Sequence, residues 1–264
     1  MEDERVVESS SSTKIIARAS SSSRASTSTT GVDRRAETVT FRATSRRGGG
    51  DDEDEDVVVT VRQNRGAIAV DPTARWVWDS CPLVCEYLCD EENVDALVRG
   101  RRVVELGAGT GMPGLVCSKL GAASVTLTDL PSELALLEEN VKLNARPGDS
   151  PVCVRACAWG ELDDETRTYD TVVVSDVLYH QPVRVLEALA NTLRALVDPD
   201  NGIVVFASSR TIFAKISCTI RSFLSSSIAR STSARASPLK TRQTCGYTNG
   251  RSRSVETDSV ALES

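Results

Sequence analysis

The sequence predicts a doubly wound α/β fold with a Rossmann-like parallel sheet, and three observations support this prediction. Short apolar runs typical of buried strands alternate with amphipathic helical segments. Nearly all of this periodic apolar sequence lies between residues 57 and 210. A glycine-rich loop, Gly107 to Gly111, joins one predicted strand to the helix that follows it. Strands and helices that alternate in this way form right-handed βαβ units, so the strands should be parallel.

The predicted elements begin with a strand at residues 57–61. The segment Trp76-Val-Trp78 follows and leads into a helix that Asp79 or Ser80 can cap. Ser132 can cap a later helix in the same way. The other predicted strands are residues 103–106, 125–128, 152–158, 171–175 and 203–207, and the other predicted helices lie at 115–120, 132–141, 185–196 and 211–224. The run 171–175 is apolar almost throughout, as expected of a strand that is buried on both faces.

The two ends of the chain differ from its middle in composition. Counted from the sequence, the net charge is −3 for residues 1–56, −8 for residues 57–210 and +5 for residues 211–264. The first segment is rich in Ser and Arg and ends in an acidic run, and residues 225–264 are rich in Ser, Thr and Arg. Such segments bury too little apolar surface to order themselves. We therefore expect disorder at 1–56 and 225–264, and one domain at 57–224.

Composition also argues against several classes of protein. The net charge of −6 disfavours a nucleic-acid-binding protein, and no run of about 20 apolar residues predicts a membrane span. The single histidine, His180, excludes a His-rich metal site. The eight cysteines have no CxxC spacing, which favours reduced thiols in a cytoplasmic protein. The Ser/Arg-rich start leaves targeting to an organelle as the alternative, and we expect a monomer.

Chemistry is expected at the carboxyl ends of the strands, where parallel sheets bind ligands. The glycine loop lets its backbone approach a ligand closely, and Asp129 ends the next strand, where a carboxylate can accept hydrogen bonds from ribose. Glu105 stands two residues before Gly107 and suits a cationic ligand better than a pyrophosphate. This pattern favours S-adenosylmethionine. A dinucleotide is the alternative, because Gly109 to Gly114 also fits GxGxxG.

The segment Glu105-Leu-Gly-Ala-Gly-Thr-Gly111 resembles motif I of the seven-strand (class I) S-adenosylmethionine-dependent methyltransferases. Four further segments narrow the resemblance: Val77-Trp78-Asp79, Thr128-Asp129-Leu130, Cys157-Ala-Trp159-Gly160 and Ser175-Asp176-Val-Leu-Tyr179. In this order they are similar to the protein-lysine methyltransferase group with an Asp-x-x-Tyr motif, which includes the valosin-containing-protein lysine methyltransferase. The resemblance covers about residues 57–210.

The resemblance implies a cofactor, S-adenosyl-L-methionine, and a protein substrate, without a metal or nucleic acid. The implied cofactor-binding residues are Trp78, Glu105, Gly107, Ala108, Gly109, Gly111, Asp129, Trp159 and Ser175, and the implied catalytic residues are Asp176 and Tyr179. Asp129 would hold the ribose, Trp159 would lie beside the adenine, and Trp78 would close the methionine end. Asp176 and Tyr179 would frame the lysine amine, whose neutral form attacks the methyl group. Each of these side chains also has an ordinary alternative, as a core aromatic residue or a cap.

The sequence departs from the family after the predicted helix at 211–224. Methyltransferases of this class complete their sheet with a C-terminal β-hairpin, and the Ser-rich tail has no signal for one. We therefore expect the sheet to lack this hairpin, and our hypothesis is that the Ser-rich tail replaces the true C-terminal part through an error in the gene model. If the tail is genuine, the sheet should have an exposed edge. A non-catalytic interaction module with this fold is the second hypothesis, and a nicotinamide-dependent oxidoreductase is the third.

Overall fold

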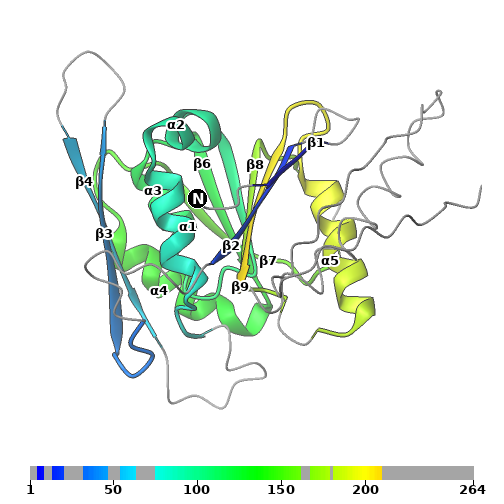
Figure 1. Cartoon of the computed structure of the whole chain (residues 1–264). Helices are drawn as coiled ribbons and strands as arrows, with labels where there is room; N and C mark the ends of the chain where they lie inside the picture. Colours follow the sequence, from blue (N-terminus) through cyan, green and yellow to red (C-terminus); the bar gives the residue numbers. More distant parts are fainter. Residues whose placement is uncertain are drawn as a thin grey trace, which may run out of the picture.

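A seven-stranded sheet forms the centre of the molecule (Figure 1). The computed structural model describes residues 5–8, 14–20, 32–46, 54–63, 75–161, 167–178 and 181–209 of the chain. The strand order is β1-β2-β9-β8-β5-β6-β7. The strands are β1 Arg5–Glu8, β2 Lys14–Ser20, β5 Arg102–Leu106, β6 Ser124–Asp129, β7 Val152–Ala156, β8 Thr171–Ser175 and β9 Ile203–Ser209. All neighbours are parallel except β1 and β2, so the predicted parallel α/β fold is confirmed.

Helices cover both faces of this sheet. They are α1 Ser80–Cys89, α2 Glu91–Asn93, the π-helical turn η2 Val94–Val98, α3 Met112–Lys119, the 3₁₀ turn η3 Pro131–Glu133, α4 Leu134–Asn144 and α5 Val183–Leu196. Val103 of β5 packs in the core on the side of α1, α3 and α4, whereas its neighbour Val104 packs in the core beneath α5. This alternation follows from the period of two along a strand. Because both faces are buried, the central strands are apolar runs.

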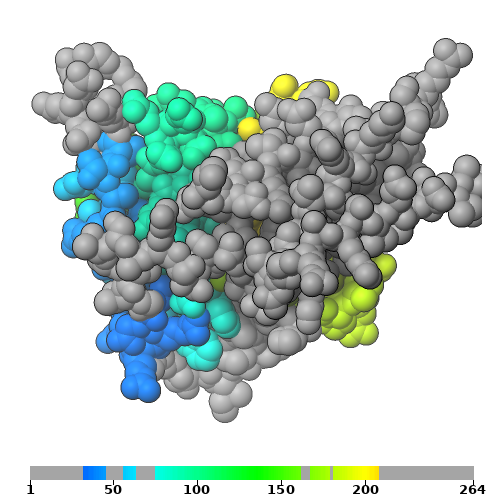
Figure 2. Space-filling model, in the orientation of Figure 1, coloured from blue at the N-terminus to red at the C-terminus, as the bar shows by residue number. Residues whose placement is uncertain are grey.

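A separate antiparallel hairpin lies against the helices α1, α3 and α4. It consists of β3 Thr38–Arg46 and β4 Asp54–Arg62, and Figure 1 shows it at one flank, beyond α1 and α3. In the space-filling view the hairpin and α5 reach the surface on opposite flanks (Figure 2). Val57, Val59 and Val61 point into the core, so the predicted strand at 57–61 exists but does not join the main sheet.

Where the structure describes the first 56 residues, at 5–8, 14–20, 32–46 and 54–56, it corrects the expectation of disorder. Within that segment β1, β2, β3 and the start of β4 are strands. In β3 the apolar residues Val39, Phe41 and Ala43 alternate with polar ones, and this face packs on the core. The alternation was visible in the sequence, but the Ser- and Arg-rich average composition of the segment concealed it.

The edge of the sheet beside β9 is occupied by β2, from Lys14 opposite Ile203 to Ser20 opposite Ser209. The expectation of an exposed edge was therefore wrong. Backbone N–H and C=O groups make this pairing, so the composition of the segment does not reveal it. The predicted helix at 211–224, the tail at 225–264 and any C-terminal hairpin lie outside the described residues.

Two predicted helix caps differ from the observed ones. Asp79 occupies the N-cap position of α1 without a side-chain cap bond and instead pairs with Arg34. Ser132 lies in the η3 turn and donates to Glu133 Oε1, so α4 begins without the predicted cap.

Cys81, Cys85 and Cys89 form the predicted stripe along α1, and all three are buried. Within the described ranges, every helix is too short or too polar to cross a membrane.

Close packing between α3 and the sheet depends on Gly114. A Cβ atom at this position would lie 2.2 Å from Leu127 Cδ2 and 2.9 Å from Glu105 Oε2. We expect Gly114→Ala to lower the free energy of unfolding by about 2 to 3 kcal/mol, since both neighbours are buried and cannot move freely. Urea denaturation measures this change.

Gly100→Ala is the control for this substitution. Gly100 has φ +68°, but a Cβ atom added there would have open space around it, so only backbone strain of about 1 kcal/mol is expected. Equal losses of stability in the two variants would contradict the packing argument.

Candidate active site

A cavity of about 510 Å³ opens at the carboxyl ends of β5, β6 and β8, the predicted edge of the sheet. This size is typical of sites for small molecules and cofactors. The lining residues are Trp76, Trp78, Cys81, Glu105, Gly107, Ala108, Gly109, Thr110, Pro113, Asp129, Leu130, Cys157, Ala158, Trp159, Ser175, Asp176, Val177, Gln181, Arg184, Val185 and Ala188. The sheet therefore brings together most of the residues that the sequence singled out.

The glycine loop between β5 and α3 forms one wall of the cavity. Gly107 has φ +63°, and a Cβ atom there would come within 2.9 Å of Val177 Cγ1 and 3.3 Å of the Trp159 ring. Glycine therefore allows both the turn and the close approach of the backbone to the cavity. Gly107, Ala108 and Gly109 line the cavity as expected, whereas Gly111 does not. Gly111 is instead the left-handed N-cap of α3 and faces Leu127 and Leu137.

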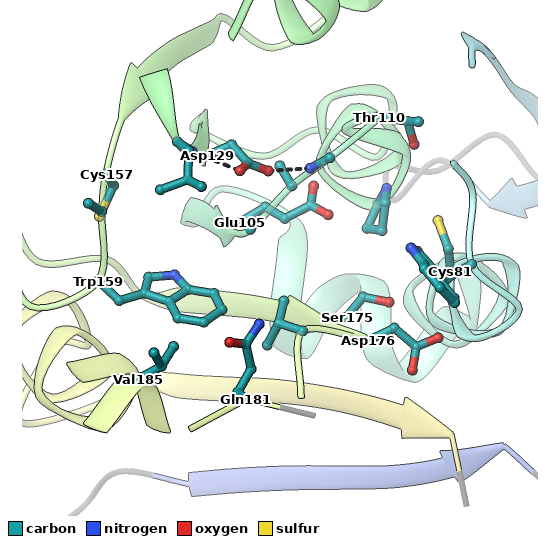
Figure 3. Close-up of a pocket in the computed structure, with 18 of the residues that line it drawn as sticks. Cys81, Glu105, Thr110, Asp129, Cys157, Trp159, Ser175, Asp176, Gln181 and Val185 are labelled. Carbon is teal, nitrogen blue, oxygen red and sulfur yellow. Dashed lines mark hydrogen bonds between the residues drawn. The ribbon is translucent and has the colours of Figure 1, made fainter. Parts of the chain in front are cut away.

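Asp129 lies at the end of β6 with both carboxylate oxygens held by the backbone. Oδ2 accepts a hydrogen bond from Gly109 N at 2.7 Å, and Oδ1 accepts one from Leu130 N at 2.7 Å (Figure 3). The side chain is buried but lines the cavity. A carboxylate has about four acceptor positions, so Asp129 can accept further hydrogen bonds from a ligand while it holds the glycine loop.

Glu105 is a carboxyl group at the base of the cavity. It is 2% exposed, and its Oε2 accepts a hydrogen bond from Gly114 N at 2.8 Å. Burial, reinforced by the negative charge of Asp129, raises the pKa of Glu105 to about 8 despite this hydrogen bond. A cation bound nearby would favour the ionised form. The cavity is therefore chemically suited to a ligand that carries positive charge.

All three tryptophans of the chain line the cavity. The rings of Trp76 and Trp78 are 6.4 Å apart, and the Arg34 guanidinium lies 4.8 Å from the Trp78 ring centroid. Trp159 follows β7, and the turn after it is fixed because Gly160 N donates to Thr192 Oγ1 of α5 at 2.8 Å. Sequence analysis identified Trp78 and Trp159 but missed Trp76, although its position two residues before Trp78 was a signal.

The end of β8 is attached to the start of α1. Ser175 Oγ and Ser80 Oγ lie 3.0 Å apart, and Asp176 Oδ2 accepts a hydrogen bond from Ser80 N at 3.3 Å. Asp176 has φ +51°, uncommon for a residue other than glycine. Its carboxylate lines the cavity at the N-terminus of α1. Tyr179 and His180 lie outside the described residues, so the predicted place of Tyr179 stays a prediction.

The first turns of α5 supply a wall that sequence analysis missed. Gln181 lies just before α5, and Arg184, Val185 and Ala188 belong to it. The helical pattern at 185–196 predicts Val185 on the core-facing side together with Leu186. The buried residues of α5 begin at Leu186, and the first turn overhangs the cavity instead. Hydrophobic periodicity cannot distinguish these two surroundings.

The side chains divide the cavity into two ends. In Figure 3, Asp129 and Trp159 lie toward one end, Ser175, Asp176 and Cys81 lie toward the other, and Glu105 is between them. This layout fits an elongated ligand that has a flat ring and hydroxyl groups at one end and a cationic group near its middle.

Comparison with known proteins gives the family of this chain. The profile of the family described as "Lysine methyltransferase" matches residues 56–217, more than half of the chain. The chain belongs to this family.

Relatives within the lysine methyltransferase family include mouse EEF1A lysine methyltransferase 3, which is 39% identical over 153 residues, or 57% of this chain and 61% of the relative. Protein N-lysine methyltransferase METTL21A of Xenopus tropicalis is 41% identical over 105 residues, or 39% of this chain and 46% of the relative. The chain thus spans less than two thirds of the length of either relative. Among solved structures, ribosomal protein L11 methylase of Lactobacillus delbrueckii subsp. bulgaricus is 22% identical with a TM-score of 0.40, covering 55% of this chain and 67% of that chain.

Proposed function

We propose that this protein transfers methyl groups from S-adenosylmethionine to a lysine side chain of a protein substrate. The observation that carries the proposal is the pairing of Asp129 and Glu105 in one cavity, beside Trp159, in a chain of the lysine methyltransferase family. The buried Glu105 carboxyl group can ionise beside a cationic cofactor, whereas a pyrophosphate would raise its pKa further, so the site favours the cation. The same observation disfavours the oxidoreductase hypothesis.

The cavity has a suitable group for each part of the cofactor. Asp129 would accept hydrogen bonds from the ribose hydroxyls, and Trp159 would offer a flat apolar face to the adenine. The backbone of Gly107 to Gly109, Ser175 and the ring of Trp78 would enclose the methionine end, and the nearby carboxyl group of Glu105 would ionise beside the positive charge of the cofactor. When bound, the cofactor supplies a methyl group that is already activated on a sulfonium.

The residues of the chain then have to orient the acceptor amine and exclude water. A lysine amine has an ordinary pKa near 10.4, so it must lose a proton before it can attack the methyl carbon. We propose that Asp176, fixed by Ser80 N, orients the ammonium group as this proton leaves to solvent. Tyr179 would offer an aromatic face to the amine.

Asp176→Asn tests the role of this carboxylate. The amide oxygen of the variant can still accept the bond from Ser80 N, so the fold of this corner should persist. We expect kcat for methyl transfer to fall by about 100-fold or more because the negative charge that orients the amine is lost. The affinity for S-adenosylhomocysteine should stay within about twofold, since the substitution does not remove a contact with the cofactor. A matching loss of affinity would assign Asp176 to cofactor binding instead.

Transfer of a labelled methyl group tests the function itself. Calorimetric titration with S-adenosylhomocysteine comes first, and we expect binding in the micromolar range, with none for NAD. The protein is then incubated with methyl-labelled S-adenosylmethionine and a protein extract. Label recovered as methyllysine supports the proposal, and label on another residue would change the acceptor.

Because one relative is named for EEF1A, that protein is the first single substrate to test. Cofactor binding without any transfer would support the hypothesis of a non-catalytic module. A cytoplasmic location and a monomeric state stay predictions.

A further inference from the structure

The β3–β4 hairpin has no lining residue of its own in the cavity, among the residues that the structure describes. It is nevertheless bonded to two of the cavity walls. One wall is the glycine loop, and the other is the segment that carries Trp76 and Trp78. Both connections are made by buried amide side chains, one on α4 and one at the end of β4.

The first connection begins with two asparagines of α4 that pair with the free edge of β4. Arg62 N donates to Asn140 Oδ1 at 2.8 Å, and Asn140 Nδ2 donates to Arg62 O at 3.3 Å. Asn144 makes the same pair of bonds with Thr60, at 2.9 and 2.7 Å. Residues four apart on a helix are separated by about 6 Å along its axis, and residues two apart on a strand by about 6.8 Å. The two asparagines therefore match the outward backbone groups of β4.

Asn140 differs from Asn144 in its third hydrogen bond. Asn140 Nδ2 donates to Thr110 O of the glycine loop at 3.0 Å, and Thr110 lines the cavity. Asn144 Nδ2 donates instead to Asn140 O within α4, at 2.7 Å. Asn140 is fully buried, and Asn144 is 6% exposed. Asn140 thus joins the hairpin directly to the cofactor-side loop, whereas Asn144 only joins the hairpin to the helix.

The second connection is Gln63, the residue after β4. Its Nε2 donates to Ala36 O at 2.9 Å and to Asp33 O at 3.2 Å, so the side chain is anchored in the turn before β3. Its Oε1 accepts a hydrogen bond from Val77 N at 2.9 Å. Val77 lies between Trp76 and Trp78, and both rings line the cavity. Gln63 is buried. Its amide fixes the distance between the turn before β3 and the backbone that carries the two rings.

We propose that the β3–β4 hairpin is a positioning element for the cofactor cavity, with Asn140 and Gln63 as the positioning residues. This inference rests on the proposed function, because it treats the cavity as the site for S-adenosylmethionine. The hairpin holds the glycine loop and the tryptophan segment at a fixed separation, although it does not contact the ligand. If one connection is lost, the wall that it holds becomes more mobile in the free protein. The cofactor then has to order that wall when it binds, which lowers its affinity.

The test compares Asn140→Ala with Asn144→Ala in the full chain. Each variant loses two hydrogen bonds to β4 and one to another carbonyl, so both should lose a similar part of the free energy of unfolding in urea. We expect Asn140→Ala to weaken binding of S-adenosylhomocysteine by about tenfold, the effect of one buried hydrogen bond. Asn144→Ala should change that affinity by less than about twofold. Equal affinities in two folded variants would overturn the proposal.

Hydrogen exchange of the ligand-free protein gives a second measurement that does not depend on cofactor binding. We expect faster exchange at residues 107–112 in Asn140→Ala only, and faster exchange at Val77 in Gln63→Met, which keeps the length of the side chain but loses its hydrogen bonds. Gln63→Met also serves if Asn140→Ala does not fold. Wild-type exchange in a folded Gln63→Met would overturn the assignment of Gln63. If the wild-type protein does not bind S-adenosylhomocysteine, the proposed function fails, and the exchange data still decide the role of the hairpin.

Discussion

Asp129→Asn is expected to weaken binding of S-adenosylhomocysteine by about 100-fold, because two hydrogen bonds from ribose to a charged group are worth about 3 kcal/mol or more. The wild-type carboxylate already accepts bonds from Gly109 N and Leu130 N. An asparagine has one oxygen, so its amide group would meet one of these N–H donors as a second donor. The substitution should therefore also loosen the glycine loop. Calorimetric titration measures the affinity, and urea denaturation measures the loss of stability.

Asp170→Asn is the matched control for this experiment. Asp170 precedes β8, at the end of the sheet opposite the cavity, and its carboxylate accepts hydrogen bonds from Arg102, including one from Nη2 at 2.6 Å. These hydrogen bonds hold the pKa of Asp170 below its usual value. This pair contributes stability above the ordinary pKa of aspartate and loses it as the pH falls through the lowered value. Asp170→Asn should lower stability by less than about 1 kcal/mol and leave the affinity unchanged. A similar loss of affinity in both variants would show that the effect of Asp129 is indirect.

Glu105→Gln is expected to stabilise the free protein and to weaken binding of the cationic cofactor. The pKa of Glu105 is raised from an ordinary 4.5 to about 8. Between these values the folded state keeps a proton that the unfolded state has lost. Stability therefore falls as the pH rises through this window, by at most about 1.4 kcal/mol per pH unit, and levels off above it. Glutamine removes this dependence, and its oxygen can still accept the bond from Gly114 N.

Two pH series measure this effect. Urea denaturation at about pH 6 and about pH 9 should show a gap between the wild type and the variant that widens as the pH rises. For the wild type, S-adenosylmethionine affinity should fall by up to about tenfold per pH unit below about 8, because binding must then expel the proton. The variant should bind weakly and without this dependence. Parallel pH profiles of affinity for the two proteins would contradict a role for the Glu105 charge.

Residues in the glycine loop and at the strand ends could be found from the sequence because the signals were local. A buried parallel strand needs an apolar run, the sharp turn after it needs glycines with positive φ, and a polar residue at the next strand end is exposed to the same edge. Gly107, Asp129 and Asp176 lie at the cavity for these reasons. Two details differ from the prediction. Gly111 is the N-cap of α3, and the Asp176 carboxylate accepts a hydrogen bond from the backbone N–H of Ser80, the first residue of α1.

Other parts of the site depend on contacts between distant segments. Gln63 and Asn140 look like ordinary polar residues, and nothing nearby in the sequence indicates that their amides bond to Val77 and Thr110. Val185 fits the pattern of a core residue, but the first turn of α5 extends past the sheet. Such roles depend on where helices and strands pack, which periodicity does not encode.

The sequence by itself determined the parallel α/β class, the order of the strands β5 to β9 along the chain and the loop and carboxylates that mark the cavity edge of the sheet. Each of these follows from short-range patterns that any packed sheet of this kind requires. Only the tertiary structure decided that part of the N-terminal segment pairs with β9, that β3 and β4 form a separate hairpin, and that Glu105 has a pKa of about 8. Strand pairing uses backbone groups that every residue type except proline supplies, so composition does not reveal it. The pKa of a buried carboxyl group depends on which distant segments cover it, so neighbouring residues in the sequence do not reveal it either.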